Sequence, residues 1–284
     1  MYASVHPSER HQVTIIRPPR LSDLSLLSEV RRLQSYGDLI ATLSRHRIDV
    51  RYKQSILGGA WAVLQPLGLM AIYTLVFSRL VRMPSEGIPY ALFAYAGLLP
   101  WTFFSAAVSN ATGSLTTHAP LITKVYFPRE ILPVTYVLAA LVDFCVASIA
   151  LAVLVGIYRV SLTAHLAWAL PSMAGLAVYA TACGLILSTI QVRWRDIGVA
   201  LPVILQFWMF ASPVLYPLGA VPRAWRPLYV LNPVAGFVDG FRRAVVGLPP
   251  DVSALAAAAA VTAITLPVAF AAFKHLERSV ADVV

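Results

Sequence analysis

The order of apolar and polar positions along the chain predicts a bundle of membrane-spanning helices. A bilayer core of roughly 30 Å is crossed by about 20 mostly apolar helical residues, and about six segments of this chain reach that length. The predicted spans are residues 56–77, 90–112, 131–157, 166–190, 197–215 and 252–273. We therefore predict an all-α integral membrane protein whose residues 56–284 form one transmembrane domain.

The chain before the first span divides into two parts. Residues 1–30 contain several prolines and charges without helical periodicity, which predicts an extended cytoplasmic arm. Over residues 31–55, apolar side chains recur at helical spacing and arginines occupy or border the remaining face. We predict an amphipathic helix lying in the cytoplasmic membrane interface. A helix packed on a soluble domain would show the same pattern and is the alternative.

The segment near 217–246 is long and too polar to span, although apolar residues recur between its prolines. It predicts one or two short re-entrant or interfacial helices at the outer face, because non-helical backbone at that depth must be buried in protein or line a wet cavity. A folded outer loop is the alternative.

Composition and charge support a membrane location and give it an orientation. Hydrophobic residues make up 58% of the chain and charged residues 12%, against about 25% charged in soluble domains. With six spans, 15 of the 22 lysines and arginines fall on one side, which the positive-inside rule makes cytoplasmic. Both termini are thus predicted to be cytoplasmic, and the first span, with no cleavable signal peptide before it, serves as the targeting signal. Topology and anionic lipids account for the net charge of +9, so no nucleic-acid binding is predicted.

The sequence contains none of the common catalytic or nucleotide-binding motifs. It has no GxxxxGK[ST] phosphate loop, HExxH, CxxC or GxSxG, its six histidines are scattered, and its two cysteines fall within spans. We predict no catalytic residue, no metal site and no cofactor held by this chain. Asp143 is the one acidic residue well inside a span, which makes it a functional candidate. A hydrogen bond to a neighbouring helix would explain it equally well.

Residues 121–133, LITKVYFPREILP, form a charged and aromatic interruption between two apolar segments, on the side predicted to be cytoplasmic. Such a patch suits docking of another protein, because buried aromatic side chains often dominate interface energies and charges set the register. An ordinary solvated loop held at the membrane by its aromatic residues is the alternative.

Five motifs in this order carry a family resemblance: RYKQSILGGAWAVLQP at 51–66, LITKVYFPREILP at 121–133, RWRDI at 193–197, SPVLYP at 212–217 and LNPVAGFVDGFR at 231–242. Together they resemble the ABC-2 transporter permeases, and more narrowly those that export O-antigen, capsule or teichoic-acid chains. The resemblance runs from about residue 36 to the end of the chain.

The resemblance implies a permease that forms a homodimer and binds two copies of a separate ATPase subunit, which holds the ATP and Mg²⁺. It also implies a cytoplasmic coupling helix near 116–130 that enters a cleft on the ATPase, and a gate helix at the position of the amphipathic helix. By motif position the coupling role falls on Thr123, Lys124, Val125, Tyr126, Phe127, Pro128, Arg129 and Glu130.

Two further groups of residues are candidates for substrate contact. Arg47, Arg51 and Lys53 lie near the predicted cytoplasmic surface, where a lipid-linked sugar presents its pyrophosphate. Their alternative role is to anchor the chain at the membrane surface. Aromatic side chains could line a conduit for sugar rings, or could form lipid-facing belts instead. The candidates are Tyr95, Trp101, Phe103, Phe104, Phe207, Trp208 and Tyr216.

These observations predict a permease subunit for ATP-driven export of a lipid-linked polysaccharide across the bacterial inner membrane. Its partners would be the ATPase subunit, a second copy of itself, the lipid-linked polymer and membrane lipids. An ABC-2 exporter of drugs or small lipids would share the topology. A membrane-embedded glycosyltransferase or acyltransferase would need carboxylates or histidines gathered at one membrane face, and a membrane scaffold without transport activity is the third alternative.

Overall fold

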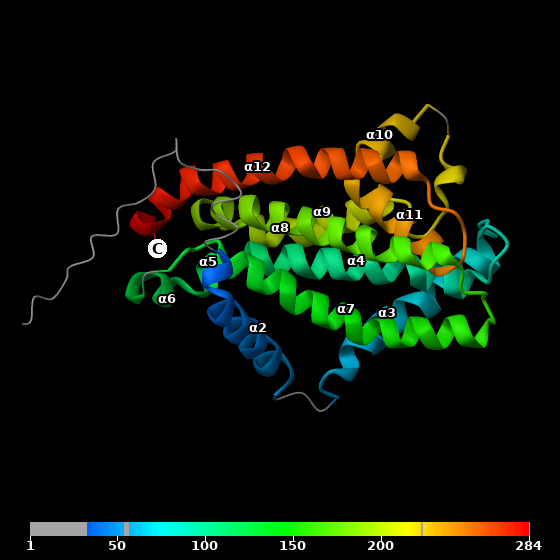
Figure 1. Cartoon of the computed structure of the whole chain (residues 1–284), viewed down its shortest axis with the longest axis horizontal. Coiled ribbons are helices and arrows are strands. Elements are labelled where there is room, and N and C mark those ends of the chain that lie inside the picture. The colour runs from blue at the N-terminus through cyan, green and yellow to red at the C-terminus, as the bar shows by residue number, and fades with distance from the viewer. Residues whose placement is uncertain (1–32, 54–56, 126, 223, 284) are drawn as a thin grey trace, which may run out of the picture. The chain divides into compact units, whose positions relative to one another are not determined.

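The computed structural model describes residues 33–53, 57–125, 127–222 and 224–283, with side chains described up to residue 277 (Figure 1). The predicted arm at 1–30, the start of the predicted gate helix and residues 54–56 lie outside the described residues. Residues 33–36 belong to a separate unit and form one helical turn, in which the Tyr36 amide donates to the Leu33 carbonyl at 3.0 Å. All that follows concerns the unit that begins at Gly37.

Every regular element in the described part of this unit is a helix, which confirms the all-α prediction. The elements are α2 (Gly37–Tyr52), α3 (Ala60–Tyr73) continuing as the π-helix η2 (Thr74–Leu80), α4 (Tyr90–Thr112), α5 (Ser114–Thr117), α6 (Ala119–Lys124), α7 (Ile131–Ile157), η3 (Ala164–Trp168), α8 (Ala169–Arg193), α9 (Ile197–Phe210), η4 (Leu218–Ala220), α10 (Arg226–Val230), α11 (Pro233–Val245) and α12 (Val252–Val283).

The protein is a multi-pass membrane protein. Among the described residues, five helices are long and apolar enough to cross a bilayer. They are Ala60–Leu80, Tyr90–Thr112, Ile131–Ile157, Ala164–Arg193 and Val252–Glu277.

The predicted span at 197–215 differs from the structure, because α9 ends at Phe210 after 14 residues, about 21 Å of helix. Pro213 cannot continue the helix, and residues 211–216 turn instead. This loop reaches the start of α4, where the Tyr90 hydroxyl donates to the Leu215 carbonyl at 2.7 Å. A side chain at Gly97 would overlap the Val214 carbonyl, so the glycine allows the loop to pack directly on α4. Helix α9 is thus a shorter apolar helix followed by a buried loop.

Helix α4 is the centre of the bundle and packs against α7, α8 and α11 (Figure 1). It is apolar over most of its surface, as expected of a helix surrounded by other helices. The Tyr95 hydroxyl crosses to α7 and donates to the Ala147 carbonyl at 2.9 Å. Near the other end of α4, Ala111 would touch any side chain placed at Gly184 of α8, so the small residue permits close helix contact.

Connections that the charge pattern assigns to the outer side meet at one end of the bundle. Arg243 of α11 pairs with Glu86 of the 81–89 connection at 3.3 Å. The Thr163 hydroxyl, in the connection after α7, donates to the Gly247 carbonyl at 3.5 Å. These contacts bring three separate chain segments together at one end of the bundle. The six-span prediction places the same three segments on one side of the membrane.

The predicted re-entrant segment near 217–246 contains the short 3-10 helix η4 and the α-helices α10 and α11. Asn232 caps α11, since its side-chain oxygen accepts from the Val234 amide at 3.2 Å. Helix α11 is buried almost throughout, and within it Arg242 and Asp239 form an ion pair that is 0% and 2% exposed. Arg242 also donates to the Pro213 carbonyl at 2.8 Å and covers the Phe93 ring. Helix α11 therefore packs into the bundle through a buried charged contact.

Candidate functional site

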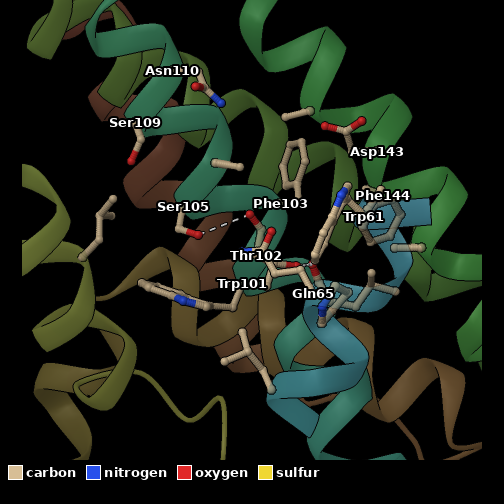
Figure 2. A pocket seen from close by; sticks show the side chains of 18 of the residues that line it. Trp61, Gln65, Trp101, Thr102, Phe103, Ser105, Ser109, Asn110, Asp143 and Phe144 are labelled. Atoms are coloured by element: carbon tan, nitrogen blue, oxygen red, sulfur yellow. Dashed lines mark hydrogen bonds between the residues drawn. The ribbon is translucent and has the colours of Figure 1, made fainter. Parts of the chain in front are cut away.

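A cavity of about 770 Å³ lies among α3, α4, α7 and α9, and we call it the groove (Figure 2). It is open on one side, and its walls combine aromatic rings with amide and hydroxyl groups. Its aromatic side chains are Trp61, Tyr73, Trp101, Phe103 and Phe144. Its neutral polar side chains are Gln65, Thr102, Ser105, Ser109, Asn110 and Gln206.

Helix α4 supplies the polar wall because its hydroxyl and amide residues share one face. Thr102, Ser105 and Ser109 follow one another at spacings of three and four residues, which places them on one side of a helix. Thr102 donates to the Leu99 carbonyl at 2.9 Å, and Ser105 donates to the Thr102 carbonyl at 3.2 Å. Their hydroxyl protons are satisfied within the helix, so their oxygens remain available to a ligand in the groove. The opposite face of α4 belongs to the core.

Asp143 of α7 lies on the groove wall and accepts hydrogen bonds on both carboxylate oxygens. Arg51 Nη1 donates to one oxygen, and the Tyr52 hydroxyl donates to the other at 2.7 Å. Both donors stand at the end of α2, 92 and 91 residues away in sequence. Asp143 is 12 residues after Ile131, about 18 Å along α7, so Arg51 meets α7 near the middle of that helix. Its place near the membrane surface stays a prediction.

Arg47 is held one turn earlier on α2. Its guanidinium carbon lies 3.4 Å from the centroid of the Tyr136 ring, and its three nitrogens are buried without a hydrogen-bond acceptor among the described residues. The Tyr136 hydroxyl lies 3.2 Å from His118 Nε2. Burial lowers the pKa of Arg47, and burial with the positive charges of Arg47 and His46 lowers the pKa of His118. Among the described residues, no carboxylate is hydrogen-bonded to the Arg47 guanidinium.

The three predicted entrance residues thus occupy different environments. Arg51 faces the groove but is paired with Asp143, Arg47 is stacked under α7, and Lys53 is exposed beyond the end of α2. The structure brings Arg51 to the groove and leaves Arg47 and Lys53 away from its wall. Their contact with a pyrophosphate stays a prediction.

The predicted conduit aromatics separate into several groups. Trp101 and Phe103 line the groove, with Phe103 packed edge-on against Phe144 at 6.0 Å between ring centroids. Tyr95 and Phe104 are fully buried in the core and do not line the groove. Helices α7 and α8 cover α4 on that face.

The remaining three aromatics stand on or after α9. Phe207 is 71% exposed and points away from the groove. The Tyr216 hydroxyl lies 2.8 Å from that of Tyr229 in the outer segment. Trp208 lines a second cavity of about 510 Å³ beside α10 and donates to the Asn232 side chain at 3.2 Å. Only Trp101 and Phe103 of the seven face the groove.

The predicted coupling residues divide between surface and interior. Thr123 and Lys124 end α6 and are exposed, as is Val125, while Tyr126 lies outside the described residues. Phe127 and Pro128 are buried. The predicted helix near 116–130 is resolved as two short helices, α5 and α6, followed by an extended segment at residue 125.

Two of the three charged residues of the coupling motif, Arg129 and Glu130, form contacts within the protein. Glu130 is 1% exposed and accepts from Lys274 Nζ at 2.8 and 2.9 Å. Arg129 donates to the Glu277 carbonyl at 2.9 Å, and Lys274 also lies 3.3 Å from the Glu277 carboxylate. Arg129 and Glu130 thus join the start of α7 to the end of α12. Their pairing with a partner protein stays a prediction, and Lys124 is the exposed charge of the motif.

The polar residues of the groove were not singled out from the sequence. Gln65, Asn110 and Gln206 lie on three different helices, and each alone resembles an isolated polar residue in a span. The helical spacing of Thr102, Ser105 and Ser109 was the available signal. Among the described residues, no group of three histidine, cysteine, aspartate or glutamate side chains is placed to hold a metal ion.

Comparison with known proteins gives a consistent result. Residues 38–246 match the family model described as ABC-2 type transporter. The chain is 31% identical to the O-antigen export system permease protein RfbA of Myxococcus xanthus, over 89% of this chain and 98% of that protein. It is 28% identical to RfbA of Klebsiella pneumoniae, over 72% and 79%, and 22% identical to the polysialic acid transport protein KpsM of Escherichia coli, over 84% and 94%. The chain therefore belongs to the ABC-2 type transporter family.

Proposed function

We propose that this chain is the permease subunit of an ATP-driven exporter that moves a lipid-linked polysaccharide across the bacterial inner membrane. The groove is the observation that carries the proposal. Polar side chains inside membrane spans are costly unless they face one another or a wet cavity, and here six of them, from α3, α4 and α9, line the same groove. Sugar rings present hydroxyl groups at their edges and apolar faces, which suit this mixture of amides, hydroxyls and aromatic rings.

A second copy of the chain would complete the conduit. The groove is open, and the two helices beside its opening, α3 and α9, expose large apolar side chains. Val199 of α9 is 79% exposed and Ile72 of α3 is 60% exposed. In a homodimer these faces would meet the partner copy or lipid, and two grooves would enclose one polar path. The names of the O-antigen and polysialic acid relatives support a polymer as the cargo.

The energy would come from two copies of a separate ATPase subunit, which would bind ATP and Mg²⁺. This chain would contribute the exposed end of α6 to the contact, and closure of the ATPases would move α6 and the adjoining start of α7. With α9 and its loop counted as a crossing, the number of spans is even and both termini lie in the cytoplasm. The charge distribution supports that orientation.

Filling the groove should stop export. In proteoliposomes containing the permease and its ATPase, we expect Ser109→Trp to reduce transport of a lipid-linked polysaccharide to background, because the new ring would occupy the polar wall. Ile149→Trp is the matched control, since Ile149 is 64% exposed on α7 and lies outside the groove. Equal transport by the two variants would exclude the groove as the path. Transport of small lipids or drugs by the wild-type protein, without polymer transport, would favour the alternative cargo.

Reversing the exposed charge of α6 should uncouple the two subunits. We expect Lys124→Glu to lower substrate-stimulated ATP hydrolysis by roughly fivefold or more, because the charge would no longer match the ATPase surface. Arg195→Glu is the control, since Arg195 is also exposed and is assigned to the same membrane side. If both variants hydrolyse ATP and copurify with the ATPase like the wild type, α6 does not couple the subunits.

A further inference from the structure

The contact between α2 and Asp143 has the chemistry of an occupied anion site. Arg51 and Tyr52 together donate to both oxygens of the carboxylate, and all three residues line the groove. Guanidinium and phenol donors arranged around two oxygens would fit a phosphate as well as a carboxylate. Asp143 therefore occupies a position that an anionic group in the groove could take.

The pair is accessible enough for such an exchange. The side chain of Arg51 is 37% exposed and that of Asp143 is 20% exposed, so a ligand in the groove can reach both. The other intramembrane pair, Arg242 with Asp239, is 0% and 2% exposed and has no opening to the groove. Solvent-accessible ion pairs contribute little net stability, so replacing one anion by another is feasible at Arg51 and not at Arg242.

Release of Asp143 would also free the end of α2. Beyond Tyr52, the chain passes through a short connection into α3, whose residues Trp61 and Gln65 form part of the groove wall. The contacts of Arg51 and Tyr52 with α7 thus hold the end of α2 beside the groove. A ligand that takes over these donors would change both the charge around Arg51 and the position of this helix end.

We propose that Asp143 is an internal competitor for a phosphate or pyrophosphate group of the transported substrate. In the resting protein its carboxylate occupies Arg51 and Tyr52 and keeps α2 against α7. The anionic group displaces it and releases α2, so that the groove opens when cargo is present. The proposal rests on the proposed function and adds a regulatory role for Asp143.

The first test measures affinity. The full-length permease in nanodiscs of neutral lipid is titrated with a polyprenyl pyrophosphate. Asp143→Asn should bind this probe roughly tenfold more tightly than the wild type, because the competing charge is gone. Arg51→Gln should bind it more weakly, and Asp143→Glu should resemble the wild type. Asp49→Asn, an exposed carboxylate on the same helix, is the control and should change nothing.

The second test follows the movement of α2. Spin labels at Val50 on α2 and Ile157 on α7, which are 60% and 66% exposed, report the separation of the two helices once Cys145 and Cys183 are replaced by alanine. The wild type should change its distance distribution when the polyprenyl pyrophosphate is added. Asp143→Asn should show the changed distribution without any ligand, while Asp49→Asn should not.

The source of the anion is distinguished by three probes. Polyprenyl pyrophosphate in neutral nanodiscs represents the lipid-linked substrate, inorganic pyrophosphate represents a free anion, and nanodiscs rich in phosphatidylglycerol represent bulk membrane lipid. We expect polyprenyl pyrophosphate to move α2 at a lower concentration than inorganic pyrophosphate does. Phosphatidylglycerol alone should leave α2 in place.

The proposal is overturned if Asp143→Asn binds the pyrophosphate probe no more tightly than the wild type, or if it leaves the helix separation unchanged. Normal polymer export by the wild type in that case would keep the proposed function intact. If Asp143→Asn moves α2 and tightens pyrophosphate binding but the wild type exports no polysaccharide, the competition stands and the cargo assignment fails.

Discussion

Replacing Lys274 by methionine is expected to destabilise the protein by about 3–5 kcal/mol. Glu130 is 1% exposed, and both of its carboxylate oxygens accept from Lys274 Nζ. Without the ammonium group the carboxylate would stay buried and unpaired, or would have to take up a proton. Breaking a buried pair on one side costs more than the pair contributes, since the remaining charge loses its partner and cannot reach water.

The measurement is thermal unfolding of the purified protein in detergent. Lys124→Met is the matched control, because it removes the same charge from an exposed position and should have little effect. The double variant Lys274→Met with Glu130→Leu should recover much of the loss, since no charge then remains buried. A single Lys274→Met variant as stable as Lys124→Met would show that the contact does not join α7 and α12 as described.

Replacing Arg242 by methionine should be similarly damaging, by about 3–5 kcal/mol, and should affect the outer segment. Asp239, 2% exposed, would lose its ion-pair partner, and the Pro213 carbonyl would lose its donor. The loop after α9 depends on this donor, because its backbone is buried inside the bundle where water cannot replace the bond. We expect looser packing of residues 211–216 on α4.

Unfolding in detergent and limited proteolysis of the outer segment would measure this effect. Arg243→Met is the control, because the neighbouring Arg243 makes a partly exposed pair with Glu86 and should cost far less. Arg242→Lys should retain part of the stability, since lysine keeps the charge but cannot donate to several partners at once. Equal stability of Arg242→Met and Arg243→Met would contradict the role given to Arg242.

These two contacts hold opposite ends of the bundle. The Lys274 contact joins the start of α7 to the end of α12, and the Arg242 contact joins α11 to the loop after α9. The groove lies between them, with walls formed by α3, α4, α7 and α9. Movement transmitted from α6 along α7 would therefore reach Asp143 and the groove wall within one continuous helix.

Much of the architecture could be predicted because membrane spans are recognised in a sequence as long, uninterrupted apolar segments. The helices α4 and α7 begin and end at the predicted residues. The span at 197–215 was predicted too long, because apolar residues continue beyond Phe210 although Pro213 and the contact of the loop with Gly97 end the helix there. Hydropathy does not distinguish apolar helix from apolar buried loop.

The candidate site was predicted less well, since residue type does not report which way a side chain faces. Tyr95 and Trp101 are both aromatic residues of α4, yet one is in the core and the other borders the groove. Arg51 and Arg47 are four residues apart, but one meets a carboxylate and the other a tyrosine ring. These differences depend on the neighbouring helices, which the local sequence does not specify.

The sequence by itself determined that this is an all-helical membrane protein and located its five long apolar helices, because length and apolarity are local properties of each segment. Its motifs also identified the ABC-2 family. Only the tertiary structure decided that the polar residues of four helices form one groove, that Arg129 and Glu130 are used internally, and that Asp143 meets Arg51. Those contacts join residues far apart in the chain, and helix packing alone brings them together.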